Sequence, residues 1–356
     1  MASFPQDQFS RPLGVLRLSL TARCNLACPY CLPDAEEPPD LLTPEERALL
    51  VKTAVGLGVH TLRLTGGEPL LHQGLEGLIR ALWPLRRSME ATPEDPEATA
   101  GLRQIALTTN GVLLSRQRAM ALKEAGLDRI TISLDGADGA SVARMAGSHG
   151  GTNSGAALLE KVLAAIEHAR AAGFDPDSGD LKLNAVITRD GNQDQLIPLA
   201  GLARQRRVEL RLIEFMDVGN RNGWEAGAVL PASEMVERIG RRWPLEALGR
   251  DRHGTASRWR YRDGGGQVAV VASISEPFCG DCNRLRITAD GVAYTCLFAS
   301  SGTDLRPWLR PHPDPAGLRH ALIELWGRRS DRYSEERADL ATTRRPSHAE
   351  MAYLGG

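Results

Sequence analysis

The chain has 356 residues, of which 42% are hydrophobic, so it can bury a large core in one large or two medium domains. Its formal net charge of −1 argues against a protein held on nucleic acid or on a membrane surface by bulk electrostatics. No apolar run approaches the roughly 20 residues of a membrane span, and residues 1–11 lack the pattern of a secretion signal. We therefore expect a cytoplasmic protein that binds neither nucleic acid nor membranes.

Short β-rich segments alternate with helical patterns over the first 213 residues. This alternation predicts an α/β protein with a parallel sheet, because parallel strands need long crossover connections. We expect a partial TIM barrel of the (β/α)6 type; a doubly wound sheet is the alternative, since strand order cannot be read from a sequence. The predicted strands are residues 15–20, 61–64, 104–108, 129–134, 182–187 and 208–213.

Local signals place several helices and loops. Thr43-Pro44-Glu45-Glu46 combines an N-cap, a proline at the first helical position and a capping-box partner, so a helix should begin there. The helical patterns at 115–125 and 156–172 are each followed by a glycine suited to a left-handed C-terminal cap. Loops are expected at 88–101, 136–154 and 175–180.

After about residue 220 the alternation stops and hairpin signals appear. Asp290-Gly291, between predicted strands at 284–288 and 292–296, is a strong two-residue hairpin signal. A second hairpin is expected at 257–262 and 267–272. We divide the chain into a barrel (13–220), a C-terminal module (221–329) and a tail (330–356). The polar composition of the tail alone predicts disorder.

All six cysteines fall into two groups of three. Cys24, Cys28 and Cys31 form a C-x3-C-x2-C pattern, and Cys279, Cys282 and Cys296 form C-x2-C-x13-C. A four-iron cluster is usually held by four cysteines, so three thiolates leave one iron open to bind another molecule. The sequence therefore predicts two such clusters, each with an open iron.

Two other readings of the cysteines are weaker. A disulfide framework is not needed in a chain of this length, and it does not fit a reducing cytoplasm. Structural zinc usually takes four ligands, and the nearest histidines to the first group, His60 and His72, do not have the spacing of a zinc finger.

The polar motifs follow the predicted strands, where a barrel carries its active groups. Cys24 follows the first strand, Gly66-Gly67-Glu68-Pro69 the second, and Asp135-Gly136 the fourth. Arg17 and Arg63 are expected near the ends of neighbouring strands.

The segment 16–31 resembles the signature of radical SAM enzymes, and Gly66-Gly67-Glu68-Pro69 is similar to their SAM-binding motif. Glu214-Phe215-Met216-Asp217-Val218-Gly219, the surroundings of the second cysteine group and the terminal Gly355-Gly356 resemble the MoaA family, the GTP 3′,8-cyclases of molybdenum-cofactor biosynthesis. One departure is Thr61, where some relatives carry Lys.

The resemblance implies a radical SAM fold with two [4Fe–4S] clusters and S-adenosyl-L-methionine (SAM) as cofactors. Reductive cleavage of SAM would give a 5′-deoxyadenosyl radical that abstracts the ribose 3′ hydrogen of GTP, and attack on guanine C8 would give (8S)-3′,8-cyclo-7,8-dihydroguanosine 5′-triphosphate. The second cluster would hold the guanine. Implied partners are an electron donor such as flavodoxin or ferredoxin, and a downstream cyclic pyranopterin monophosphate synthase; a homodimer is left open.

The resemblance also assigns site residues by position. The SAM contacts are Tyr30, Gly67, Ser133 and Met216. The GTP contacts are Arg17, Arg63, Thr108, Lys182, Arg211, Arg284 and Arg286, of which Arg17, Arg284 and Arg286 are also assigned to catalysis. Because 39 of the 43 basic residues are Arg (43 minus Lys at 52, 123, 161 and 182), a single Arg carries little information, and each of these residues alone could be a surface charge or core filler.

The resemblance implies that the tail threads into the active site, where it could bring Arg344 or Arg345 near the substrate. A radical SAM enzyme that modifies peptides, with an auxiliary cluster, is the alternative enzyme. A non-catalytic iron–sulfur carrier is the alternative outside enzymes.

Overall fold

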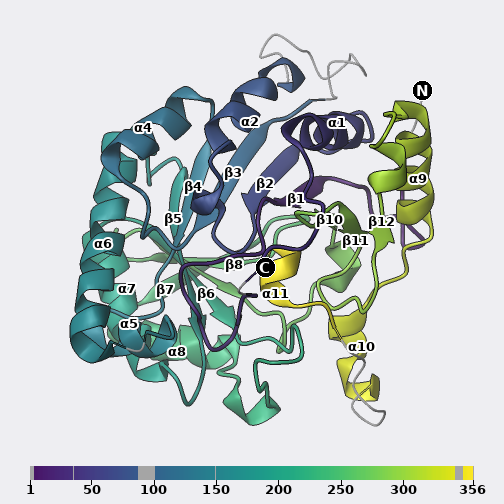
Figure 1. Cartoon of the computed structure of the whole chain (residues 1–356). Helices are drawn as coiled ribbons and strands as arrows, with labels where there is room; N and C mark the ends of the chain where they lie inside the picture. The colour runs from purple at the N-terminus through teal and green to yellow at the C-terminus, as the bar shows by residue number, and fades with distance from the viewer. Residues whose placement is uncertain (1–3, 35, 87–100, 149, 341–347, 356) are drawn as a thin grey trace.

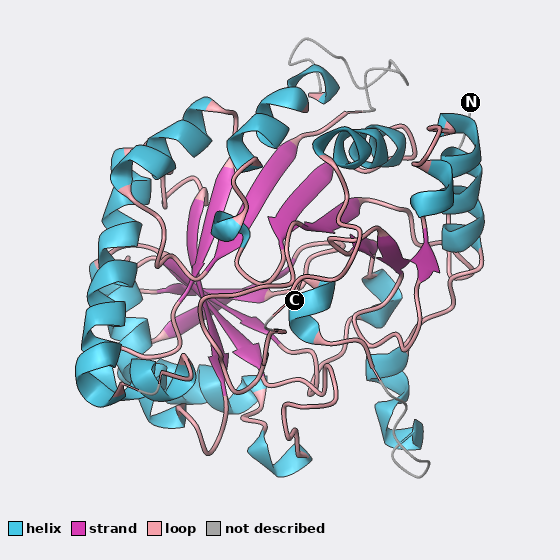
Figure 2. Ribbon diagram, viewed as in Figure 1, coloured by secondary structure: helices cyan, strands magenta, loops and turns pink. Residues whose placement is uncertain are grey.

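The computed structural model describes residues 4–34, 36–86, 101–148, 150–340 and 348–355. In this part of the chain, all named strands belong to one sheet with the order β12-β11-β10-β1-β2-β3-β4-β5-β6-β9-β8-β7. Figure 1 and Figure 2 show the strands in a curved array with helices on its outer side. The sequential order of β1 to β6 excludes the doubly wound alternative, which needs a reversal of strand order, and the partial barrel is confirmed.

Strands from the C-terminal part extend the parallel array at both edges. β10 pairs in parallel with β1, and β9 pairs in parallel with β6, so the parallel part is wider than the six strands predicted. The parallel strands are β1 (Val15–Ser19), β2 (Thr61–Thr65), β3 (Gln104–Thr109), β4 (Arg129–Ser133), β5 (Leu181–Ile187), β6 (Glu209–Glu214), β9 (Gln267–Val271) and β10 (Arg284–Ile287). The antiparallel additions are β7 (Leu245–Arg250), β8 (Ser257–Tyr261), β11 (Val292–Tyr294) and β12 (Thr303–Asp304).

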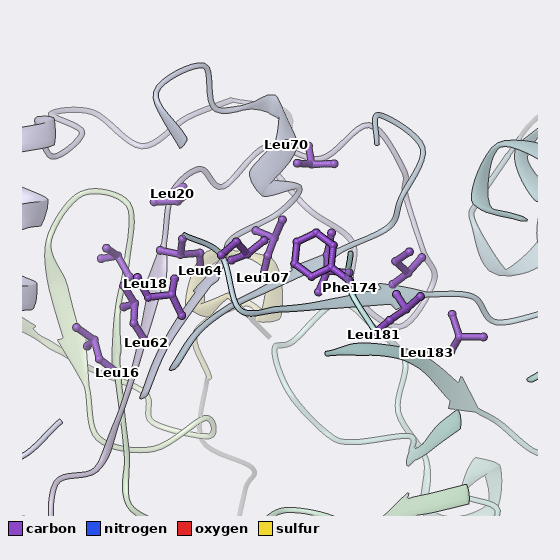
Figure 3. Close-up of a cluster of buried hydrophobic side chains, with 14 of the residues drawn as sticks. Leu16, Leu18, Leu20, Leu62, Leu64, Leu70, Leu107, Phe174, Leu181 and Leu183 are labelled. Atoms are coloured by element: carbon purple, nitrogen blue, oxygen red, sulfur yellow. The ribbon is translucent and has the colours of Figure 1, made fainter. Parts of the chain in front are cut away.

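The two faces of the parallel strands differ in chemistry. Leu16 and Leu18 of β1 are fully buried in the main hydrophobic core, as are the leucines of β2 and β3 shown in Figure 3. Side chains alternate along a strand, so Arg17 points to the opposite face, the inside of the barrel. This pattern packs the outer face against helices and leaves the inner face for polar residues.

The helices follow the predicted caps closely. Thr43 and Glu46 form the expected capping box at the start of α1, and Ser115 caps α4. None of the helices in the described residues has the length and apolarity needed to cross a membrane. The helices are α1 (Pro44–Val55), α2 (Leu75–Ala81), α4 (Arg116–Glu124), α5 (Gly139–Met145), α6 (Gly151–Ala171), α7 (Leu196–Gln205), α8 (Ala232–Arg242), α9 (Pro315–Gly327), α10 (Tyr333–Leu340) and α11 (Met351–Leu354).

The prediction of a loop at 136–154 is wrong, because α5 and the first turn of α6 lie there. The glycines that suggested a loop instead allow close packing: a Cβ on Gly155 would clash with the carbonyl oxygen of Gly139, and a Cβ on Gly139 would clash with Thr152 and Ala156. The loop expected at 175–180 contains no helix or strand and is confirmed. The remaining expected loop is 88–101, and its residues 88–100 lie outside the described residues.

The prediction of a disordered tail is wrong for its described parts. Residues 333–340 form α10, and α11 is buried, with Leu354 fully inaccessible to solvent. Arg344 and Arg345, expected near the substrate, lie outside the described residues. The hairpin at Asp290-Gly291 is confirmed as β10–β11.

Candidate active site

The first cysteine group lies in the loop after β1. Cys24, Cys28 and Cys31 line a cavity inside the barrel, and the peptide nitrogen of Cys31 donates to the carbonyl oxygen of Cys28 at 2.9 Å, which closes a tight turn. Asn110, from the loop after β3, places its side-chain amide 3.7 Å from the sulfur of Cys24. The loop is therefore tied to a neighbouring strand end rather than free at the surface.

The loop after β2 packs directly against the first cysteine loop. The peptide nitrogens of Gly67 and Glu68 each donate at 2.8 Å to carbonyl oxygens of Thr21 and Arg23. A Cβ on Gly67 would clash with the carbonyl oxygens of Ala22 and Arg23, so glycine is required for this approach. The buried carboxylate of Glu68 accepts hydrogen bonds from Leu70, Thr109 and Asn110, which fix the next strand end.

The other residues assigned to SAM line the same cavity. Ser133, at the end of β4, and Met216, after β6, both face it together with Tyr30. The hydroxyl of Tyr30 donates to a carboxylate oxygen of Asp135 at 2.6 Å. Burial raises the pKa of Asp135 to about 6, although hydrogen bonds from Tyr30 and Val186 oppose this shift.

The second cysteine group lines a second cavity. Cys279 and Cys282 precede β10 and Cys296 follows β11, so the group straddles the hairpin as predicted. The two cavities share four lining residues: Thr108, Asn184, Ile213 and Met216. The two cysteine groups therefore face one continuous interior.

A row of arginines crosses the strands between the two groups. The registers place Arg286 of β10 beside Arg17 of β1, and Arg17 beside Arg63 of β2. Arg17 and Arg63 are the middle residues of their strands, so the expectation that they lie near strand ends is wrong. Their alternating neighbours are leucines of the outer core, which requires both guanidinium groups to point inward. Six of the seven residues assigned to GTP line the second cavity: Arg17, Arg63, Thr108, Arg211, Arg284 and Arg286.

Lys182 is the exception. Its ammonium group donates at 2.9 Å to Glu209, whose other carboxylate oxygen accepts from Arg211 at 2.6 Å. Lys182 is thus linked to the cavity through Glu209 and Arg211 rather than lining it.

The scan against family models gives two matches. The Radical SAM superfamily model covers residues 18–203, and the Molybdenum Cofactor Synthesis C model covers residues 208–335. The chain is 62% identical over 355 residues to a protein named GTP 3′,8-cyclase from Parasynechococcus marenigrum (strain WH8102), covering 100% of this chain and 99% of that protein. It is 44% identical over 359 residues to the one from Xanthomonas campestris pv. campestris (strain B100), covering 99% and 97%.

The chain belongs to the GTP 3′,8-cyclase family of radical SAM enzymes. The family resemblance, the enzyme assignment and the cofactors, SAM and two [4Fe–4S] clusters, are thereby confirmed. Among solved structures, the crystal structure of Streptococcus suis SuiB bound to precursor peptide SuiA matches with a TM-score of 0.59 at 14% identity, covering 89% of this chain and 65% of that one. That likeness concerns the fold alone.

The donor sets fit the clusters of this family. All six cysteines are free thiols. A four-iron cluster attaches each thiolate to a different iron, so three thiolates can hold three of its four irons.

The thiols of the two groups differ in their electrostatic setting. Burial raises the pKa of Cys28 well above its ordinary value and raises that of Cys31 to about 12, so these thiols need the charge of bound iron to become thiolates. Burial also opposes ionisation of Cys282, but Arg284, Arg329 and Arg286 outweigh it and lower its pKa to about 6. Burial raises the pKa of Cys296, in the same group, to about 12, so the two groups differ at Cys282 rather than throughout.

Some nitrogens of the inward-facing arginines Arg63 and Arg286 are buried without a hydrogen-bond partner in the described residues. Burial, followed by Arg286 and Arg284, lowers the pKa of Arg17. The nitrogens concerned are Nε and Nη1 of Arg286 and Nε of Arg63. Buried donors of this kind favour a polyanionic ligand.

Several residues around the GTP 3′,8-cyclase site were not assigned from the sequence. Asp135 follows the fourth predicted strand, and this position did indicate that it belongs to the site. No feature of the sequence predicted its hydrogen bond with Tyr30. Glu209 and Asn184 lie on the inner faces of β6 and β5 at positions alternating with leucines, a pattern that would have predicted inward side chains. No local signal joins Arg329 to the second group.

Proposed function

We propose that the chain is a GTP 3′,8-cyclase that catalyses the first step of molybdopterin biosynthesis. When bound, the first cluster and SAM would supply a 5′-deoxyadenosyl radical that takes the 3′ hydrogen of GTP. Attack of the ribose carbon on guanine C8, followed by uptake of one electron from the electron donor and one proton, would give (8S)-3′,8-cyclo-7,8-dihydroguanosine 5′-triphosphate. The residues of the chain bind and orient the two molecules for this transfer.

One observation carries the proposal: two groups of three cysteines face a continuous, arginine-lined interior. A site that only stored or relayed electrons would not need buried guanidinium nitrogens that lack hydrogen-bond partners in the described residues, such as those of Arg63 and Arg286. Buried cations with free donors suit a triphosphate, because arginine binds phosphate oxygens through two parallel hydrogen bonds.

The positions of the residues support separate binding sites for SAM and GTP. Tyr30, Gly67, Ser133 and Met216 stand around the first cysteine group and would bind SAM. Arg17, Arg63, Thr108, Arg211, Arg284 and Arg286 stand around the second cavity and would bind GTP, with Lys182 behind them. Met216 and Thr108 line both cavities, so the ribose would lie where the two meet. Holding the 3′ carbon there limits abstraction from other positions.

The proposal extends to partners. A low-potential donor such as flavodoxin or ferredoxin would reduce the first cluster, and cyclic pyranopterin monophosphate synthase would consume the product. We place the reaction in the cytoplasm, where an oxygen-sensitive cluster is least exposed, and a homodimer is compatible with it.

The test is anaerobic incubation of the reconstituted protein with SAM, dithionite and GTP carrying deuterium at the 3′ position. We expect equal amounts of 5′-deoxyadenosine and a cyclised nucleotide that keeps its three phosphates, with the deuterium transferred to the 5′-deoxyadenosine. Cleavage of SAM with GTP left intact would point to another substrate, such as a peptide. Failure to cleave SAM at all would point to an iron–sulfur carrier.

A further inference from the structure

Three charged side chains from the two ends of the chain are buried together behind the second cysteine group. The exposed fractions of the side chains of Asp7, Arg11 and Arg329 are 0%, 2% and 1%. Charged groups are rarely buried to this extent unless they are paired and hydrogen-bonded, so these three form a built structure.

Asp7 holds both guanidinium groups. One of its carboxylate oxygens accepts from Nε of Arg11 at 2.5 Å and from Nη1 of Arg329 at 3.1 Å. The other accepts from the peptide nitrogens of Phe9 and Arg11, both at 2.9 Å. The carboxylate is thereby fixed and orients the two arginines.

The arginines direct their remaining donors at the backbone of the cysteine group. Nη1 of Arg11 donates to the carbonyl oxygen of Cys279 at 2.7 Å. Nη1 of Arg329 donates to the carbonyl oxygen of Cys282 at 2.7 Å, and its Nε donates to the carbonyl oxygen of Thr295, next to Cys296, at 3.1 Å. The two arginines therefore contact the backbone of Cys279, of Cys282 and of the residue before Cys296.

Further contacts attach this arrangement to the fold. The indole nitrogen of Trp326 donates to the carbonyl oxygen of Arg11 at 3.0 Å, and the guanidinium of Arg329 lies 4.7 Å from the ring of Trp326. Cys279 begins a short 3₁₀ turn that Cys282 caps, and Cys296 lies beyond a hairpin. These irregular segments provide little stiffness of their own, so the spacing of the three sulfurs depends on an outside support.

We propose that Asp7, Arg11 and Arg329 form a buried clamp that fixes the three cysteines at the spacing the second cluster needs. These are positioning residues, since none of them supplies a ligand. The N-terminal segment before β1 thereby belongs to the second-cluster site, although it precedes the barrel. Groups that orient metal ligands from behind commonly change metal affinity by about 10- to 100-fold when mutated.

The test compares Asp7→Asn and Arg11→Lys with Arg328→Gln as the control. Arg328 is the sequence neighbour of Arg329, but its side chain is 77% exposed and forms an ion pair with Glu324 of α9. Each protein is reconstituted anaerobically and exposed to an iron chelator, and both clusters are followed by Mössbauer and EPR spectroscopy. The first cluster is recognised by its response to SAM and serves as an internal reference.

We expect the second cluster to be lost at least about tenfold faster in Asp7→Asn and Arg11→Lys, with the first cluster and the control unchanged. Asp7→Asn should also shift the reduction potential of the second cluster upward, because it removes a buried negative charge, whereas Arg11→Lys keeps the charge and should shift it little.

Loss of the second cluster at the wild-type rate in both variants would overturn the clamp. Equal loss of both clusters would also overturn it, because the effect would then be general destabilisation. If Asp7→Asn does not fold, Arg11→Lys decides, since lysine lacks the Nε and Nη1 groups with which Arg11 donates to Asp7 and to the carbonyl oxygens of Cys279 and Asp331. No readout uses GTP, so failure of the clamp and failure of the cyclase proposal are separate results.

Discussion

Arg17 of the first strand holds the carbonyl oxygen of Gly355, 338 positions later in the chain. Its Nε and Nη2 donate to that oxygen at 3.2 and 2.6 Å, and the hydroxyl of Thr65 donates to it at 2.6 Å. An arginine proposed to bind substrate thus also seats the C-terminal tail. The backbone of Gly355 is left-handed, with φ of 72°, and a Cβ there would come within 2.7 Å of the Thr65 hydroxyl oxygen.

These hydrogen bonds from Arg17 and Thr65 predict the effect of changes at the tail. Gly355→Ala, or deletion of the last two residues, should lower GTP cyclisation by at least about tenfold, which corresponds to ~1.4 kcal/mol of lost positioning. Both clusters and reductive cleavage of SAM should stay largely intact, because the carbonyl oxygen of Gly355 binds Arg17 and Thr65 rather than either cysteine group. The measurement is the ratio of cyclised nucleotide to 5′-deoxyadenosine. Gly264→Ala is the control, since Gly264 is also left-handed but has open space around it; full cyclisation in the tail variants would show that the seat has no role in catalysis.

Arg286→Ala should weaken GTP binding by roughly 1.5–3 kcal/mol, the range for a hydrogen bond to a charged group. Two nitrogens of Arg286 are buried without partners in the described residues, so a bound anion can satisfy them. Equilibrium binding of GTP without SAM or reductant measures the effect; Arg17→Ala and Arg284→Ala form the rest of the series. Unchanged affinity in all three would make these residues a charged lining without a binding role.

Much of the barrel could be predicted because its signals are local. Alternating patterns, the cap at Thr43 and the glycines that end the helical patterns, Gly126 and Gly173, placed the strands and helices, and the cysteine spacing placed both groups. The errors have physical causes. Gly139 and Gly155 suggested a loop, yet they serve the packing of two helices. The polar tail suggested disorder, yet Arg17 and Thr65 bind it. Contacts between distant segments, such as Asp7 with Arg329, leave no local pattern.

Gly67→Ala should abolish detectable SAM binding and disturb the first cluster. A Cβ at this position would clash with carbonyl oxygens in the loop that leads into Cys24, so the two loops would have to separate. Binding of SAM and the EPR signal of the first cluster report on this. Gly77→Ala is the matched control, because a Cβ there meets nothing within 4 Å. Normal SAM binding by Gly67→Ala would mean that the loops adapt.

The two cysteine groups should have separable roles. Replacing Cys24, Cys28 and Cys31 by Ala should abolish SAM cleavage and leave about four of the eight irons expected from two clusters. Replacing Cys279, Cys282 and Cys296 should leave some uncoupled SAM cleavage but stop GTP conversion. Iron analysis and product chromatography measure both. Wild-type cyclisation in the second variant would contradict a substrate-anchoring role for that group.

The lowered pKa of Lys182 predicts how GTP binding depends on pH. Burial first, and then Arg211, lower the pKa of Lys182 from 10.5 to about 8, although Glu209 opposes the shift and Arg129 adds to it. Between about pH 8 and 10.5 the unfolded chain therefore binds more protons at this site than the folded chain does. The lowered pKa of Lys182 therefore reduces the free energy of unfolding at neutral pH. This destabilisation disappears as pH rises from about 8 to 10.5.

Binding of a triphosphate should raise the pKa of Lys182 again, because the anion favours the charged ammonium group. The affinity for GTP should therefore fall as pH rises from about 7 to 9, with uptake of a proton on binding near pH 8. In Lys182→Arg the charge stays through this range, so the fall centred near pH 8 should disappear. Calorimetry in two buffers of different ionisation enthalpy measures the proton uptake directly. The same pH dependence in wild type and Lys182→Arg would assign it to another group and remove Lys182 from the triphosphate site.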